Sequence, residues 1–188
     1  MQNPIPPTST TFSKPCGSRR CKICPHVIHS SHLTHNGKTY HPNETMTCSS
    51  TNLIYILKCD ICQAIYVGQT TQFRQRFWNH KNRITHKHNT ALSNHFNQIG
   101  HTLHNLKIFF LERINPQLGT NTNTLLLRGE AYWINELNTF QNGLNMAPAN
   151  LQTTLHQPKI TDFFSRIWKI IKLHLTIHLM DTRINIHT

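Results

Sequence analysis

Acidic side chains are scarce in this chain. Its 188 residues contain 7 Asp and Glu against 19 Lys and Arg, a formal net charge of +12 with the histidines neutral. This charge favours a polyanionic partner, because Lys and Arg contacts to phosphates release condensed counterions. The alternative is a soluble basic protein without a polyanionic partner, which could have the same composition. Because acids are so few, one set among apolar residues is a candidate for a special role.

Long apolar runs are also absent. No stretch of about eighteen uninterrupted apolar residues occurs, so we expect no membrane span and no membrane partner. The first fifteen residues are polar and rich in proline and lack the apolar core of a signal peptide. We therefore expect a reducing compartment, nuclear or cytosolic, and no secretion.

Cysteine is missing beyond residue 62. The six cysteines lie in the first third of the chain: Cys16, Cys21, Cys24, Cys48, Cys59 and Cys62. In a reducing compartment a disulfide framework is not expected, and metal binding is the better interpretation. Two pairs have the Cys-x-x-Cys spacing, which can give two thiolates to a tetrahedral, structural Zn²⁺.

The ligand pairing stays open at this stage. One zinc site using four of the six cysteines fits, and so does an N-terminal site of Cys16, Cys21, Cys24 and a histidine such as His26 or His29. A redox role is the alternative, but a thioredoxin-like setting is lacking. Because Cys59 and Cys62 fall between two tyrosines of interest, zinc there would brace that hairpin.

Alternation, helical spacing and turn residues predict both strands and helices. The expected strands are 53–58, 64–67 and 106–114, and the expected helices are 72–81, 90–98 and 124–139. Thr70 or Thr71 is the expected N-cap of the first helix. The segment 16–48 shows no helical period.

Four residues near the first helix suggest phosphate chemistry. Tyr55 and Tyr66 lie on neighbouring strands of a hairpin and can point into one pocket. Arg76 and His80 are four residues apart, so one helix face carries both. A guanidinium stabilises charge on a phosphate, and a histidine can orient water. Tyrosines also pair across sheets for purely structural reasons.

Glu130 is the acid that stands out. It lies in a mostly apolar helical stretch, RGEAYWI, where a carboxylate is costly unless it serves a partner. One carboxylate, waters and substrate phosphates make a normal Mg²⁺ shell. An exposed acid facing Arg128 is the structural alternative.

These motifs resemble the GIY-YIG endonuclease domain. Leu53-Ile54-Tyr55 stands for the first signature, with Leu in place of Gly, and Tyr66-Val67-Gly68 for the second. Arg76, His80 and Glu130 match the helix arginine, the histidine and the metal-binding glutamate, and Gly143-Leu144-Asn145 matches the closing turn. The match covers about residues 50–147.

The resemblance implies an α/β (α+β) fold, a three-stranded antiparallel sheet flanked by helices and preceded by a Cys-rich zinc-knuckle segment. It implies that Tyr55 is the general base or holds the attacking water, that Arg76 stabilises the transition state, and that Glu130 binds Mg²⁺ or Mn²⁺. Tyr66 and His80 would shape the site, and Gly68 and Asn145 would position the substrate, DNA.

The cysteine pattern is similar to that of the endonuclease domain of Penelope-like retroelements. Such elements carry a reverse transcriptase, which this chain is too short to hold. We therefore expect either a fragment of an element or a host-encoded copy of its endonuclease. In an element, a nick would expose a 3′ hydroxyl for priming.

The tail carries one further motif. The stretch 157–164 resembles the PIP box, the peptide that binds the replication sliding clamp (PCNA), with an aromatic pair as anchor. Its candidate anchors are Gln157, Ile160, Phe163 and Phe164. A terminal hydrophobic helix packed on the domain is the alternative. The expected organisation is a disordered lead-in (1–14), a zinc segment (15–49), a nuclease domain (50–147), and a linker with tail (148–188).

The sequence thus predicts a metal-dependent DNA endonuclease that nicks phosphodiester bonds. The alternative is a transposon-derived, zinc-containing DNA-binding module without catalysis. A zinc-stabilised protein-interaction adaptor is the third class. It differs from the other two because salt would then change nucleic-acid affinity little.

Overall fold

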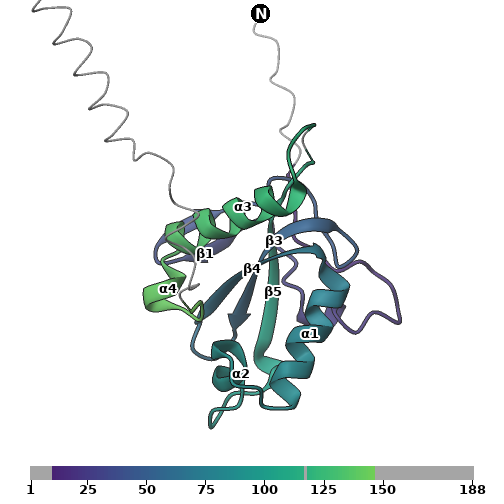
Figure 1. Cartoon of the computed structure of the whole chain (residues 1–188). Helices are drawn as coiled ribbons and strands as arrows, with labels where there is room; N and C mark the ends of the chain where they lie inside the picture. Colours follow the sequence, from purple (N-terminus) through teal and green to yellow (C-terminus); the bar gives the residue numbers. More distant parts are fainter. Residues whose placement is uncertain (1–9, 117, 147–188) are drawn as a thin grey trace, which may run out of the picture. The chain divides into compact units, whose positions relative to one another are not determined.

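The computed structural model describes residues 10–116 and 118–146, which lie in one compact unit (Figure 1). At its centre is a three-stranded antiparallel sheet in the order β4-β3-β5, formed by Ile65–Gln72, Thr51–Cys59 and Leu106–Arg113. The middle strand, β3, is buried on both faces from Leu53 to Leu57. This explains its continuous apolar run, because a strand covered on both sides does not alternate.

One face of the sheet is covered by α1 (Phe73–Thr85), α2 (Ala91–Phe96) and the N-terminal Cys-rich segment. The buried residues of α1 recur at helical spacing, which turns one stripe of this basic helix toward the sheet. They are Phe73, Phe77, His80 and Ile84. The Cys-rich segment shares this core through Ile23, Met46 and Cys48, so it and the nuclease stretch fold together.

The other face is covered by α3 (Thr122–Glu136) and by the small hairpin of β1 (Leu33–His35) and β2 (Lys38–Tyr40). Leu126 and Ile134 of α3 and Leu33 of β1 pack there on the apolar residues of the sheet. The short helix α4 (Thr139–Asn142) follows α3. In Figure 1, α3 and α4 lie across the sheet from α1.

Both edges of the sheet are occupied by neighbouring segments. On β5, Ile28 donates from its backbone N–H to the carbonyl of Ile108, and the Asn43 amide bonds both backbone groups of Arg113 at 2.9 Å. On β4, the amide of Asn145 bonds both backbone groups of Val67 at 2.8 Å. Two asparagines thus satisfy edge-strand backbone groups on opposite sides of the sheet.

The three-stranded sheet flanked by helices confirms the predicted fold class, but several element boundaries differ. β4 continues through Thr70 and Thr71 to Gln72, which is the N-cap of α1 and makes no side-chain cap bond, so neither threonine caps this helix. Strand pairing with β3 extends to Gln72 and overrides the local capping preference.

The helices differ in length as well. The first ends at Thr85 rather than near residue 81, and α3 spans Thr122–Glu136 rather than 124–139. The hairpin β1–β2 within 16–48 was not expected. Among the described residues, every helix falls short of the length and apolar character needed to cross a bilayer.

Candidate active site

Tyr55 and Gly68 face each other across the β3–β4 ladder. Tyr55 is fully buried. A Cβ on Gly68 would lie 2.5 Å from the Tyr55 hydroxyl and 2.8 Å from the Tyr66 ring, so only glycine leaves room for both aromatic side chains. On its other side, β3 shifts register against β5 between Ile54 and Tyr55. Such bulges re-aim side chains, and here the irregularity adjoins the buried tyrosine.

Arg76 and His80 of α1 meet at the same phenol. Arg76 donates from Nε to the Tyr55 hydroxyl at 3.0 Å, and Nε2 of His80 lies 2.8 Å from that oxygen. Burial raises the pKa of Tyr55, and the nearby Tyr66 raises it further while Arg76 opposes the shift. Burial, with the charges of Arg76 and Arg83, lowers the pKa of His80 to about 3. At neutral pH the site therefore contains a neutral phenol, a neutral imidazole and a guanidinium.

Tyr66 extends the site toward the edge of the sheet. Its ring centroid lies 5.6 Å from that of His80, and its side chain is only partly buried. Burial raises its pKa, while the adjacent Arg76 charge opposes the shift. Because β4 is an edge strand, Tyr66 lies closer to solvent than Tyr55.

Glu130 approaches from α3, which packs on the other face, beside β4. Burial raises the pKa of its carboxyl, opposed by the Arg76 charge and by the backbone N–H of Gln69. None of the ion pairs among the described residues involves Glu130. The remaining described acids all have a side-chain partner: Glu44 has Arg113, Asp60 has Lys107, Glu112 has Trp133 and Glu136 has Lys38. A partly buried carboxylate held near an arginine without an ion pair fits a single carboxylate ligand of a divalent cation.

Asn145 comes directly after the segment in which Gly143 passes close to β4. A Cβ on Gly143 would lie 2.6 Å from the carbonyl oxygen of Ile65, so glycine is required where the segment crosses the strand. Leu144 then donates to Ile65 at 2.8 Å, and Asn145 bonds Val67. Its amide is occupied by this strand. The Asn145 amide thus holds β4 at Val67, next to Gly68, and its predicted role in positioning the substrate stays a prediction.

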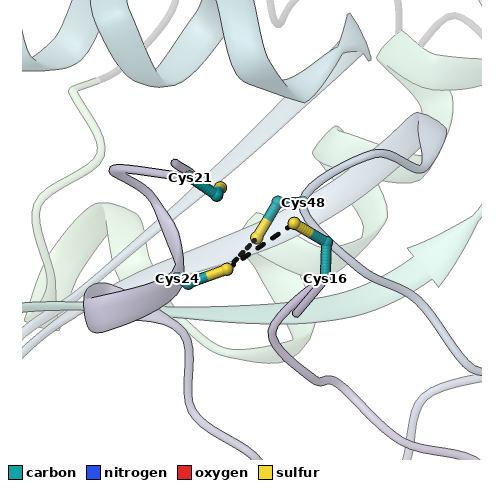
Figure 2. Close-up of side chains that lie close together, drawn as sticks. All are labelled: Cys16, Cys21, Cys24 and Cys48. Carbon is teal, nitrogen blue, oxygen red and sulfur yellow. Dashed lines mark hydrogen bonds between the residues drawn. The ribbon is translucent and has the colours of Figure 1, made fainter. Parts of the chain in front are cut away.

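Four cysteines lie close together on the α1 side of the sheet: Cys16, Cys21, Cys24 and Cys48 (Figure 2). The sulfur of Cys24 is 3.6 Å from that of Cys16 and 3.8 Å from that of Cys48, too far for a disulfide. Zn–S bonds of about 2.3 Å in a tetrahedron place sulfurs roughly 3.8 Å apart. A hydrogen bond from the Ser18 backbone lowers the pKa of Cys16 to about 7. The cluster therefore has the geometry of a four-thiolate metal site.

A second cluster joins the β3–β4 turn to α2. The ligand atoms of Cys59, Cys62, His95 and His101 all lie within 4.8 Å of one another. Cys59 Sγ is 3.3 Å from His101 Nδ1, and Cys62 Sγ is 3.6 Å from His95 Nε2. Two thiolates and two imidazoles are a frequent zinc ligand set. The six predicted cysteines thus divide into two groups, and the second is completed by two histidines.

His95 and His101 were not among the ligands predicted from the sequence. Their spacing, six residues apart and downstream of Cys59-x-x-Cys62, was the available signal, but fifteen histidines obscured it. The proposed fourth ligands of the N-terminal site were wrong. His26 instead bonds the carbonyl of Leu106 at 2.9 Å, and the His29 ring lies beside Phe12. Cys48 takes the fourth place in that cluster.

The structure thus brings the five predicted catalytic residues to one region around β4. The clamp-binding anchors Gln157, Ile160, Phe163 and Phe164 lie outside the described residues. Two phenols, a guanidinium, an imidazole and a carboxylate with metal-ligand character define a site suited to hydrolysis of phosphate esters.

Comparison with known proteins agrees with this class. A family model described as the GIY-YIG catalytic domain matches residues 51–145, just over half of the chain. The chain belongs to the GIY-YIG family and is an enzyme of the nuclease class. The matched region includes all five candidate catalytic residues.

Two solved structures are also similar to this chain. The catalytic domain of the homing endonuclease I-TevI is 27% identical, covers 52% of this chain and 100% of its own, and superimposes with a TM-score of 0.43. A glutamate-to-alanine mutant of that domain, from the intron endonuclease I-TevI, gives 27% identity, 53% and 97% coverage and a TM-score of 0.44. A search of curated proteins found no match.

Proposed function

We propose that this protein is a metal-dependent endonuclease that hydrolyses phosphodiester bonds in DNA and introduces nicks. The observation that carries the proposal is the Tyr55 hydroxyl, held between Arg76 Nε at 3.0 Å and His80 Nε2 at 2.8 Å. A buried tyrosine needs one hydrogen-bond partner for its hydroxyl, whereas Tyr55 has both a partly buried guanidinium and a buried neutral imidazole on the same oxygen. The net charge of +12 suits a DNA substrate.

The proposed chemistry begins with Tyr55 as a neutral phenol. Its hydroxyl accepts the hydrogen bond from Arg76 and donates to the unprotonated Nε2 of His80. The second lone pair of the Tyr55 oxygen accepts a hydrogen bond from a water and orients it toward phosphorus, and the proton of this water is released to solvent as it attacks. The new phosphorus–oxygen bond forms as the bond to the 3′ oxygen breaks, and the 3′ oxygen takes up a proton from solvent to become a hydroxyl. Arg76 stabilises the charge that develops on the phosphate.

Glu130 is the proposed ligand of Mg²⁺ or Mn²⁺. Its carboxylate is partly buried and has no ion pair among the described residues, and the Arg76 charge opposes the rise in its pKa that burial causes. When bound, the cation would supply positive charge to the scissile phosphate and the leaving oxygen. Tyr66, partly buried next to His80, would shape the entrance to this site.

We further propose zinc in both cysteine-containing clusters and an origin in a Penelope-like retroelement. The first rests on the tetrahedral spacing of sulfur and nitrogen atoms in the two clusters. The second rests on the cysteine pattern from Cys16 to Cys62, and sequencing the genomic DNA on both sides of the gene for a reverse transcriptase reading frame tests it. A nuclear or cytosolic location and clamp binding through residues 157–164 remain predictions.

Nicking of supercoiled plasmid tests the central proposal. We expect the zinc-loaded chain to convert supercoiled DNA to open circles with Mg²⁺ or Mn²⁺. Glu130→Gln should abolish nicking, while Glu136→Gln, the same change on the same helix at an exposed ion pair with Lys38, should leave it intact. Absence of nicking by the wild type with either metal, or equal nicking by Glu130→Gln, contradicts the proposal. DNA binding without nicking would instead favour the inactive DNA-binding module.

A further inference from the structure

Helix α1 carries basic residues on both of its flanks. Arg76 and Arg83 lie on the flank toward His80 and the active site, where their charges act on that imidazole. Arg74, Trp78 and Lys81 follow at helical spacing on the opposite flank. This second group, the far flank of α1, is not explained by the proposed chemistry.

The Cys-rich segment packs against the far flank. Arg74 donates from Nη2 to Ser49 Oγ at 2.9 Å, and the same nitrogen lies 3.9 Å from Cys16 Sγ. The His26 ring lies 5.3 Å from that of Phe77. Residues 17–23, the knuckle loop, are thereby held near α1 through Cys16, which Arg74 contacts and which lies beside Cys24 at the other end of the loop.

The knuckle loop and the far flank together form a basic surface. Arg19, Arg20 and Lys22 are exposed, and Lys81 is partly exposed. None of these four residues forms an ion pair among the described residues. The sequence has no Asp or Glu in residues 1–43 or 61–111, which include the knuckle loop and all of α1. Unpaired cations without neighbouring acids favour a polyanion over a protein partner.

An aromatic side chain stands within this basic surface. Trp78 is 46% exposed, although most large apolar residues of α1 are buried. Lys81 Nζ lies 4.9 Å from the centroid of its ring, so a cation is already fixed beside the indole. An exposed aromatic ring among cations is the arrangement with which proteins hold unpaired bases, since the base stacks and the cations contact its phosphates.

We propose that the knuckle loop and the far flank of α1 form a second contact surface for the DNA substrate, across α1 from the active site. Arg19, Arg20, Lys22 and Lys81 contact phosphates there, and Trp78 stacks on a base that has no partner. This inference rests on the proposed function for the identity of the nucleic acid. It deepens that function by assigning a substrate class, DNA with an unpaired stretch next to the cleaved bond.

Binding measurements on the full chain test the proposal. The chain carries Glu130→Gln throughout, so DNA is not cut and no chelator is needed that would remove metal from the clusters. Fluorescence anisotropy is followed with a gapped duplex and a fully paired duplex at several salt concentrations. We expect Trp78→Ala to weaken binding to the gapped duplex about ten-fold, within the range for loss of one stacked base, and to affect the paired duplex much less. Trp78→Phe should retain most of the preference.

The charged part of the surface has a matched control. Arg19→Ala/Arg20→Ala should reduce the slope of log affinity against log salt by about 2, because two phosphate contacts are lost. Lys38→Ala/Lys58→Ala removes the same charge near His35, on the side of the sheet away from α1, and should change the slope little. Circular dichroism and metal content establish that each variant folds.

The outcomes separate this inference from the proposed function. If Trp78→Ala binds both duplexes as the parent does, or if the two double variants behave alike, the second surface is wrong, whether or not the protein nicks DNA. If the variants behave as expected but the wild type nicks no DNA, the surface stands and the enzyme proposal fails.

Discussion

The hydroxyl of Tyr55 lies 2.5 Å from the position that a Cβ on Gly68 would take. The two residues are direct partners across β3 and β4, so the absence of one side chain makes room for the other. The same hydroxyl accepts a hydrogen bond from Arg76 and is hydrogen-bonded to His80. A glycine on an edge strand therefore determines where the central oxygen of the proposed site lies.

Gly68→Ala should displace Tyr55 and impair catalysis more than folding. The added methyl group also meets the Tyr66 ring, and overpacking of this kind costs about 1–3 kcal/mol. We expect nicking to fall at least a hundred-fold. Gly37→Ala is the control: at φ 76° it costs about 1 kcal/mol in backbone strain, but its Cβ meets nothing within 4 Å. Equal activity of the two variants in plasmid nicking would refute the steric argument.

His80 should make the fold sensitive to acid. Its pKa is near 3 in the folded protein against 6.5 for an unperturbed histidine, so the unfolded chain binds the extra proton between these values. The contribution of His80 to the free energy of unfolding is therefore fully present above about pH 6.5 and is lost as the pH drops toward 3. The free energy of unfolding of His80→Gln should fall less steeply in this window than that of the wild type, by up to about 1.4 kcal/mol per pH unit.

Urea unfolding from pH 4.5 to 6.5 measures this difference. Loss of metal from the clusters also depends on pH, but it affects wild type and variant alike, so the comparison of slopes isolates His80. Parallel curves for the two proteins would mean that the imidazole is not held neutral by its surroundings.

Each cluster should hold one zinc ion. Native mass spectrometry is expected to show two ions per chain, falling to one in Cys48→Ser and to one in His101→Asn. His104→Asn, an exposed histidine three residues along, should keep both. A wild type with no zinc, or a full complement in both ligand variants, contradicts the two-site assignment.

Asn145→Ala should loosen the outer strand of the sheet. It leaves the N–H and C=O of Val67 without their partners, and unsatisfied buried polar groups cost about 1–3 kcal/mol each. We expect a loss of about 2 kcal/mol in urea unfolding and reduced nicking, because Gly68 is the next residue. Asn142→Ala, an exposed change nearby, should alter neither; an unchanged stability in Asn145→Ala would show that the amide bonds are dispensable.

The sequence predicted the parts of the fold that depend on local pattern. The apolar run of β3, the strand that ends near Gly68 and the basic helix after it are visible in residues 53–81. The end of β4 was not predicted from the sequence. Pairing with β3 holds Thr70 and Thr71 in an extended conformation, although each is a good helix cap. Tertiary pairing outweighs a capping preference of about 1 kcal/mol.

Candidate site residues could be predicted where the chemistry needs particular residue types at a particular spacing in the sequence. Arg76 and His80 lie one helical turn apart, and Glu130 is an isolated acid in an apolar stretch. The ligand sets of the two clusters were not predictable, since Cys48 joins Cys16 only through packing of distant segments. The same holds for His95 and His101, which approach Cys59 and Cys62 only because α2 lies beside the β3–β4 turn.

The two edge asparagines have a consequence for the behaviour of the protein in solution. An open sheet of three strands exposes two rows of backbone donors and acceptors, which can pair with a strand from another molecule. Asn43 and Asn145 occupy such positions at Arg113 and Val67, one on each edge. Side-chain amides thus imitate part of a neighbouring strand, and together with the backbone of Ile28 at Ile108 and of Leu144 at Ile65 they reduce the length of edge that is open to pairing with another molecule.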